Sequence, residues 1–184
     1  MATRYRFGEN DYAYFVTYAV VSWVDALSRP AYKDIIVNSL DFCINNKGLT
    51  LHAWVIMNNH VHLIASGCDE HKLEDIMRDH KKFTAQELLR AIQNNNQESR
   101  QSWMLWLFSS AGQNNPNNKY HQFWQQDNHP VKLTTMEMII QKLNYLHDNP
   151  VRARIVFEPQ HYVYGSAVDY FTERKGLLPV TLLL

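Results

Sequence analysis

The sequence predicts an α+β fold with a ferredoxin-like (RRM-like) core, in which helices cover an antiparallel sheet and one helical element is inserted. Three observations lead to this fold class. Segments rich in β-branched and aromatic residues alternate with segments of helical periodicity. Two strand-like segments follow each other directly, which favours a hairpin. The 184 residues can bury one core, so we expect residues 1–184 to form a single domain.

The first half of the chain predicts the order strand, helix, strand, strand. Residues 12–23 are rich in β-branched and aromatic side chains, as is typical of a strand. A helix is predicted to begin near Pro30 and to end before Gly48, because apolar side chains recur between them at helical spacing. Two more strands follow, LTLHAWVIM and HVHLIAS. They are joined by Asn58-Asn59, a pair that tolerates positive φ and suits a tight turn.

The second half predicts two long helices and one more strand. Residues 72–93 form an amphipathic helical pattern, with apolar side chains on one face and charges on the other. A short apolar helix between two asparagine-rich stretches indicates an insertion at about residues 94–119. Residues 121–130 predict a strand. The last helix, TTMEMIIQKLNYLHDNP, is expected to have a threonine cap and to stop before Pro150.

The composition excludes several classes of protein. Cys43 and Cys68 form no CxxC pair, so neither a zinc knuckle nor a disulfide framework is indicated. No stretch approaches the roughly 18 apolar residues of a membrane span, and the N-terminus lacks signal-peptide features, so we expect a cytoplasmic protein with no membrane partner. The 18 Lys and Arg balance the 18 Asp and Glu, so the net charge is zero. This counts against a strongly basic nucleic-acid-binding protein but permits a local basic patch.

His60 and His62 flank Val61 in one of the predicted strands. Because residues i and i+2 of a strand point to the same face, about 6.6 Å apart, both imidazoles should project together while Val61 faces the core. Two neutral imidazoles in this arrangement can share a metal ion. Two ordinary surface or core histidines would give the same pattern, and the pair alone does not separate these alternatives.

A second pair of polar side chains lies on the last predicted helix. Tyr145 and Asn149 are four residues apart, so the phenol and the carboxamide share one helix face about one turn apart. Core packing of Tyr145 and a helix stop at Asn149, before Pro150, are the ordinary alternatives for these two residues.

Taken together, these segments resemble the single-tyrosine HUH transposases, in particular the REP-associated tyrosine transposases and the related transposases of small insertion sequences that move as single-stranded DNA. The resemblance rests on three blocks in the family's order, AWVIMNNHVHLI, FWQQDNHP and KLNYLHDNPVRARIV. It extends from about Tyr12 to Tyr170. It implies that residues 1–184 form one HUH tyrosine transposase domain.

The resemblance implies a role for each matching residue. His60 and His62 match the two metal-binding histidines. Asn149 matches the polar residue that completes the metal site, where related insertion-sequence enzymes commonly have glutamine. Tyr145 matches the nucleophile that attacks a DNA phosphate and keeps the 5′ end as a phosphotyrosine, while the 3′ end leaves as a hydroxyl. His129 lies in a block typical of the family but receives no role.

The expected cofactor is a divalent metal, Mg²⁺ or Mn²⁺. A tyrosine of pKa near 10 is a poor nucleophile at neutral pH, so a cation that neutralises developing charge at the phosphate assists it. Both ions accept six-coordinate geometry with oxygen ligands, and imidazole suits Mn²⁺ better, so we expect activity with either ion and tighter binding of Mn²⁺. A tyrosyl ester stores the energy of the broken phosphodiester, so the strand can be resealed without ATP. The sequence accordingly contains no P-loop pattern for a nucleotide.

The expected partners are single-stranded or hairpin DNA and, from the resemblance, a second copy in a homodimer. Basic side chains would contact the DNA backbone, and exposed aromatic side chains would stack on bases. The candidate backbone contacts are Arg78, Lys81, Lys82, Arg152 and Arg154. The candidate stacking residues are Trp103, Trp106 and Trp124, for which core packing is the better explanation. Lys142 could stabilise the phenolate of Tyr145, although an ordinary solvated charge explains it better.

The sequence therefore predicts a DNA transposase that cleaves and transfers strands through a covalent 5′-phosphotyrosine. Two alternatives remain at this point. One is a domesticated DNA-hairpin-binding protein that no longer transposes, and the presence of all the matching residue types argues against such decay. The other is a small metal-dependent phosphohydrolase that uses His60 and His62 with a water, which leaves Tyr145 and Asn149 unexplained.

Overall fold

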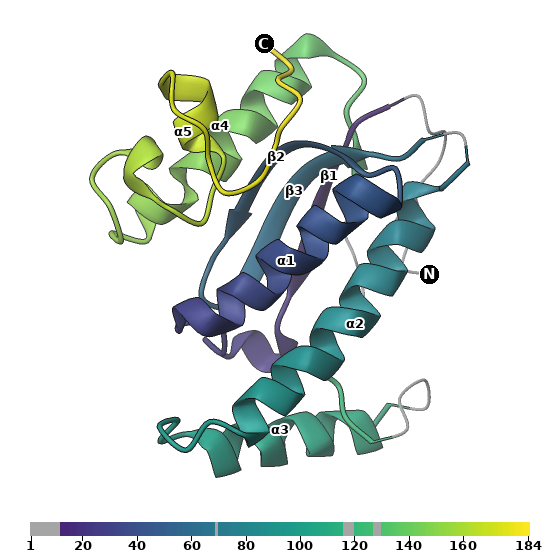
Figure 1. Ribbon diagram of the computed structural model, residues 1–184, viewed down its shortest axis with the longest axis vertical. Helices are drawn as coiled ribbons and strands as arrows, with labels where there is room; N and C mark the ends of the chain where they lie inside the picture. The colour runs from purple at the N-terminus through teal and green to yellow at the C-terminus, as the bar shows by residue number, and fades with distance from the viewer. Residues whose placement is uncertain (1–11, 69, 116–119, 127–129) are drawn as a thin grey trace.

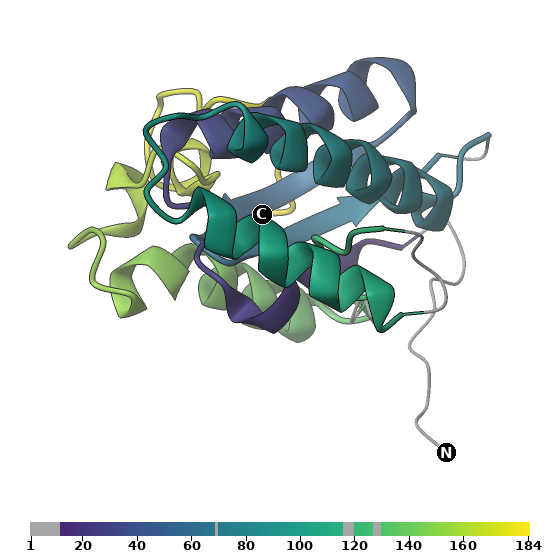
Figure 2. The same ribbon diagram turned by 90° about the horizontal axis from the view of Figure 1, so that it is seen from below.

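An antiparallel sheet lies between two layers of helices in the computed structural model (Figures 1 and 2). The structure describes residues 12–68, 70–115, 120–126 and 130–184. The strands follow the order β2-β3-β1-β4, and all neighbouring pairs are antiparallel. Their bounds are Tyr14–Ala19 (β1), Thr50–Ile56 (β2), His60–Ser66 (β3) and Val131–Lys132 (β4). This order matches the ferredoxin-like β-α-β-β-α-β arrangement, so the predicted fold class is confirmed.

The helices are divided between the two faces of the sheet. Two long helices, α1 (Pro30–Asn46) and α2 (Leu73–Gln93), cover one face, and α4 (Met136–Arg152) covers the other (Figure 2). A further helix, α3 (Gln101–Gln113), packs at the far end of α2 (Figure 1). The short elements are η1 (Val21–Trp23), η2 (Pro159–His161) and α5 (Ala167–Phe171). Among the described helices, none has both the length and the apolar character of a membrane span.

Alternation of side chains along the strands produces one core on each face of the sheet. The core under α1 and α2 includes Tyr14, Val16, Tyr18, Val61 and Leu63. The core under α4 includes Phe15, Val55, Ile64, Leu143 and Leu146. Val61 therefore faces the first core, as predicted, and its neighbours His60 and His62 face α4.

The strand predicted over residues 12–23 is shorter than expected. It ends at Ala19, and a 3₁₀ turn follows. The physical reason is that Ser22 and Trp23 have positive φ values of 55° and 56°, which a strand does not accommodate. The helix that follows begins at Pro30, and Gly48 lies just past its end with a φ of 67°, as predicted.

Asn58 and Asn59 join β2 to β3, as predicted, but neither residue uses the positive φ that the pair tolerates. The turn is closed by the N–H of Met57, which donates to the carbonyl oxygen of His60 at 2.8 Å. This bond uses no group of Asn58 or Asn59. Their carbonyl oxygens and side-chain amides can therefore bond to other parts of the molecule.

Two expectations for the second half are wrong. Within residues 121–130 the described part makes only an isolated bridge, between Trp124 and Val20, and the strand β4 lies just beyond it. The last helix does not stop before Pro150, which is buried inside α4. Pro150 lies in the last turn, so its missing N–H interrupts the helix only near its end.

The helix predicted within residues 94–119 is present as α3. It buries Met104 and Phe108 in the same core as the apolar face of α2. That these residues are an insertion in a single domain stays a prediction.

Thr135, and not Thr134, caps α4, because its Oγ1 accepts a hydrogen bond from the N–H of Met138 at 3.2 Å. We expect Thr135→Ala to lower the free energy of unfolding by about 1 kcal/mol, measured by urea denaturation. Thr134→Ala is the matched control, since its hydroxyl donates to the Met138 sulfur, a weak acceptor. Equal losses in the two variants would contradict this assignment of the cap.

Candidate active site

His60 and His62 lie side by side on the face of β3 that α4 covers. Their ring centroids are 4.7 Å apart, as expected for imidazoles on the same side of a strand. His62 is only 4% exposed and stacks on Phe15 of β1, with 5.2 Å between ring centroids. His60, at the start of the strand, is half-buried. The pair therefore has one deep and one more accessible imidazole.

Tyr145 and Asn149 reach this pair from α4. The Tyr145 ring lies 5.3 Å from the His62 ring, and the Asn149 amide lies next to His60. The Nδ2 of Asn149 also donates to the carbonyl oxygen of Tyr145 at 3.0 Å. Tyr145 is 40% exposed, so the phenol is open to solvent on one side. The structure thus brings together, within one chain, the four side chains singled out in the sequence.

The β2–β3 turn is fixed to its surroundings by the asparagines next to His60. The carbonyl oxygens of Asn58 and Asn59 accept hydrogen bonds from the N–H groups of Leu27 and Val20, both at 2.8 Å. The Oδ1 of Asn58 also accepts from the buried Lys33 at 3.1 Å. These bonds hold the start of β3 and so limit the positions open to His60.

Each imidazole also has a hydrogen-bond partner that can set its tautomer. The Nδ1 of His62 lies 2.7 Å from the Oγ1 of Thr17, and the Nδ1 of His60 lies 2.7 Å from the Oδ1 of Asn59. Asn59 can only accept through this oxygen, so Nδ1 of His60 carries the proton. Neutral imidazoles that donate through Nδ1 keep the lone pair of Nε2, as in many metal-binding histidines.

The residues present fit a divalent cation. The Nε2 of His62 is buried without a hydrogen-bond partner, and an unpaired buried nitrogen of this kind needs an explanation that a metal ion would supply. His60 and the Asn149 amide adjoin it. In the described part of the chain no group of three or more His, Cys, Asp or Glu could hold a metal. The side chains that could hold a cation here are therefore two imidazoles and an amide.

Burial keeps both imidazoles in the neutral form that binds metal. It lowers the pKa of His62 to about 3, and the charges of His60 and Lys142 act in the same direction. Burial also lowers the pKa of His60, while the hydrogen bond with Asn149 opposes this. Neither ring has to lose a proton at neutral pH before it can act as a ligand.

Two cations flank the phenol ring of Tyr145. The Nζ of Lys142 lies 5.8 Å from the ring centroid and 4.9 Å from that of Phe15. The Cζ of Arg152 lies 5.7 Å from the Tyr145 centroid. Lys142 is therefore part of the site, which corrects the expectation of a simple solvated charge, and Arg152 is there as well. Both bring positive charge close to the phenol ring, where it can attract a phosphate.

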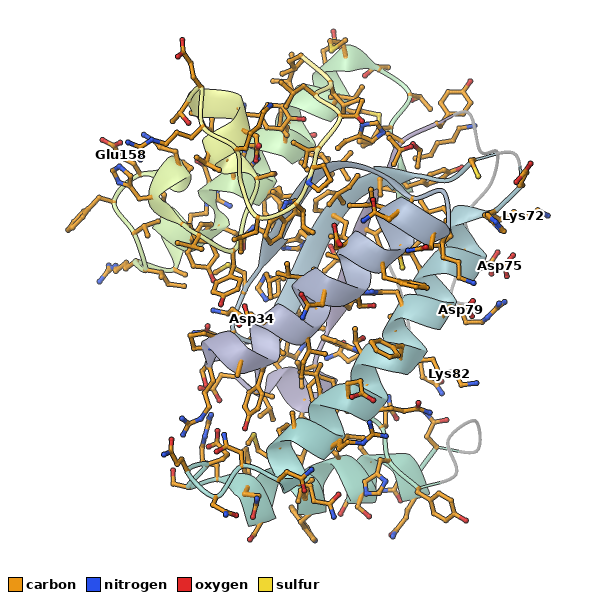
Figure 3. The ribbon with its side chains drawn as sticks, viewed as in Figure 1. Asp34, Lys72, Asp75, Asp79, Lys82 and Glu158 are labelled. Carbon is orange, nitrogen blue, oxygen red and sulfur yellow. The ribbon has the colours of Figure 1, made fainter. Side chains whose placement is uncertain are left out.

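The other predicted DNA contacts lie away from the imidazoles. Arg78 forms ion pairs with Asp75 and Asp79, which offset its charge. Lys82 points outward from α2 on the same side as these two carboxylates (Figure 3). Lys81 donates to the carbonyl oxygen of Gln125 at 3.0 Å. All of them belong to α2, which covers the opposite face of the sheet.

The remaining candidates have mixed outcomes. Arg154 is exposed just past the end of α4. Trp103 and Trp106 are exposed on α3, so core packing does not explain them. Trp124 is buried, as core packing predicts, and cannot stack on a base. His129 lies outside the described residues.

Sequence reasoning missed Phe15 and Thr17. Both contact His62, but only the register of β1 against β3 brings them there, with Thr17 directly opposite His62. Alternation within the first strand places the two on one face. Alternation does not show which strand pairs with the first one, or which of its residues lies opposite Thr17.

The comparisons with known proteins concern the family and the fold. The family model "Transposase IS200 like" matches residues 24–126, more than half of the chain, so the chain belongs to the IS200-like transposases. The matched segment contains His60 and His62 and ends before Tyr145 and Asn149. No curated protein matches the chain.

Two solved structures are similar to this chain. A REP-associated tyrosine transposase bound to a REP hairpin has a TM-score of 0.63 at 12% identity, over 100% of this chain and 94% of that chain. At this identity the likeness supports the fold. A candidate transposase from Deinococcus radiodurans R1 is 16% identical over 80% of this chain and 95% of that chain, with a TM-score of 0.44. A TM-score this low supports no conclusion.

The lowered pKa of His62 predicts a loss of stability in acid. The unfolded imidazole titrates near 6.5, and the folded one near 3. Its stabilising contribution is therefore complete above about pH 6.5 and is lost as the pH falls towards 3. We expect His62→Gln to reduce the slope of unfolding free energy against pH, between pH 6 and 4, by up to about 1.4 kcal/mol per unit. Urea denaturation of both proteins across this range measures it, and identical slopes would contradict the assignment.

Proposed function

We propose that this IS200-like transposase cleaves and transfers single-stranded or hairpin DNA through a covalent 5′-phosphotyrosine on Tyr145. His60, His62 and Asn149 would hold the Mg²⁺ or Mn²⁺. The observation that carries this proposal is the contact of the half-exposed Tyr145 ring with His62, at 5.3 Å between centroids, in one chain. A structural tyrosine would need no such neighbour and no flanking cations.

The chain's own residues account for the steps of the reaction. The phenol oxygen of Tyr145 attacks a DNA phosphorus as its proton leaves to solvent, and Lys142 and Arg152 stabilise the phenolate charge. The bond between phosphorus and the 3′ oxygen breaks. The electron pair stays on that oxygen, which takes a proton to become a 3′-hydroxyl. A bound cation supplies charge neutralisation at the phosphate.

Strand transfer is the reverse reaction with another strand. A 3′-hydroxyl attacks the phosphotyrosine, the new phosphodiester forms, and Tyr145 regains its proton. Because one ester replaces another, no nucleotide cofactor is needed. The partial exposure of Tyr145 leaves room for an incoming strand.

The alternatives explain less of the site. A metal-dependent phosphohydrolase would use His60 and His62 but has no use for the phenol and the two cations beside them. A hairpin-binding protein without activity would not need a phenol beside two neighbouring imidazoles. A DNA hairpin as substrate is supported by the similar fold of a transposase bound to a REP hairpin.

The cellular setting and the assembly are also proposals. We propose that the protein acts in the cytoplasm. The expected homodimer stays a prediction, and because Tyr145 meets His62 in its own chain, a dimer would not be needed to complete the site.

Replacing Tyr145 tests the reaction. Incubation with labelled single-stranded hairpins and Mn²⁺ should give a covalent adduct on a denaturing gel, and Tyr145→Phe should abolish it while hairpin binding is kept. Tyr164→Phe is the control, because the Tyr164 hydroxyl bonds to Asp34 instead. An adduct in Tyr145→Phe at the wild-type level would refute the proposal. Phosphate release from small esters without any adduct would favour the hydrolase.

Metal affinity tests the ligand set without reference to activity. Calorimetric titration with Mn²⁺ should show binding to the wild type and none to His62→Ala. Thr17→Val keeps the shape of the side chain and removes the partner of Nδ1, so we expect a loss of about 10- to 100-fold. Ser66→Ala is the control, because Ser66 lies on β3 like His62 but its hydroxyl bonds to His52. Unchanged affinity in His62→Ala would exclude it as a ligand.

A further inference from the structure

Trp23 lies beside the candidate site on a backbone that tryptophan rarely adopts. Ser22 and Trp23 have consecutive positive φ values of 55° and 56°. The left-handed region is uncommon for residues other than glycine, and most of all for bulky ones. Such conformations persist where the surroundings hold them, and they gather at ligand and active sites.

The backbone of Trp23 is held by polar contacts on both sides. Its carbonyl oxygen accepts from the Nδ2 of Asn59 at 3.1 Å, and its N–H donates to the carbonyl oxygen of Val20 at 3.0 Å. Asn59 also contacts the imidazole of His60 through its Oδ1. One asparagine therefore links the position of Trp23 to that of a candidate metal ligand.

The indole ring itself is largely uncovered. Trp23 is 55% exposed, whereas Trp54 and Trp124 are buried in the core. Its ring centroid lies 5.7 Å from that of His60, with the two planes inclined at 66°. More than half of the Trp23 surface is therefore accessible to a ligand next to the imidazoles. Nucleobases of single-stranded DNA stack on exposed aromatic rings of this kind.

The rings of the site follow one another from the nucleophile outward. Neighbouring centroids are separated by 5.3 Å from Tyr145 to His62, 4.7 Å from His62 to His60 and 5.7 Å from His60 to Trp23. Trp23 is thus the aromatic side chain at the His60 end of this series. A strand whose phosphate lies between Tyr145 and the imidazoles would present a flanking base to it.

We propose, on the basis of the proposed function, that Trp23 forms a base-stacking subsite for single-stranded DNA. It binds a nucleobase next to the phosphate that Tyr145 attacks. The subsite is independent of base identity, since every base has a π face. The strained backbone of Ser22 and Trp23 holds the indole in place before the DNA binds, which reduces the ordering cost of binding.

Fluorescence of 2-aminopurine tests this subsite directly. The probe is a hairpin oligonucleotide with single-stranded tails that carry 2-aminopurine at successive positions, and the protein is the Tyr145→Phe form, so that nothing is cleaved. We expect stacking on Trp23 to quench one position next to the attacked phosphate. Adding Trp23→Ala should remove that quenching and weaken DNA binding about tenfold, and Trp23→Phe should restore most of both.

Phe42→Ala is the matched control, since Phe42 is 54% exposed on α1, on the opposite side of the sheet. It should leave quenching and affinity unchanged. The proposal is overturned if Trp23→Ala keeps the quenching, or if Phe42→Ala loses as much quenching and affinity. It is also overturned if Trp23→Phe recovers neither quantity and both Trp23 variants unfold at a lower temperature than the parent protein. Adduct formation by protein with Tyr145 intact reports on the proposed function separately, so the two can fail independently.

Discussion

The packing of α4 against the face of the sheet that carries the two histidines is the contact on which the site depends. Leu143, Leu146, His147 and Pro150 form the buried side of the helix. Burial of one leucine is worth about 1.5–3 kcal/mol, so together these side chains fix the rotation of the helix about its axis. Tyr145 and Asn149 lie just off that buried side. Their approach to His60 and His62 follows from apolar packing, before any metal or DNA is present.

The sheet side of the site is equally well held. Thr17 meets the Nδ1 of His62 across the β1–β3 ladder, and Asn59 meets the Nδ1 of His60. Neutral imidazoles lie on one side of Tyr145, and the cations Lys142 and Arg152 flank its ring. A phosphate between them would meet opposite charge without a competing carboxylate from these side chains. Preorganisation of this kind is the main source of catalysis in phosphoryl transfer.

Much of this architecture could be predicted from the sequence, and the failures have physical causes. The period-2 alternation around Val61 and the spacing of Tyr145 and Asn149 are local properties, so the faces of β3 and α4 were predicted correctly. Thr17, Phe15 and Lys142 join the site through register and packing between distant segments, which one sequence does not reveal. The strand does not extend to Trp23, whose carbonyl oxygen is held by Asn59 of the β2–β3 turn, a contact between distant segments that outweighs local strand propensity. Local propensity predicts a helix stop before Pro150, because it does not include the burial of the proline ring inside α4.

Peptide mapping of the trapped covalent complex by mass spectrometry tests the central claim most directly, namely that α4 delivers the nucleophile to the imidazoles of the strand. Protein incubated with a hairpin oligonucleotide and Mn²⁺ is digested with nuclease and protease, and the modified peptide is sequenced. The account predicts a nucleotide joined through its 5′ phosphate to the phenol oxygen of Tyr145. A nucleotide joined to another side chain would contradict it.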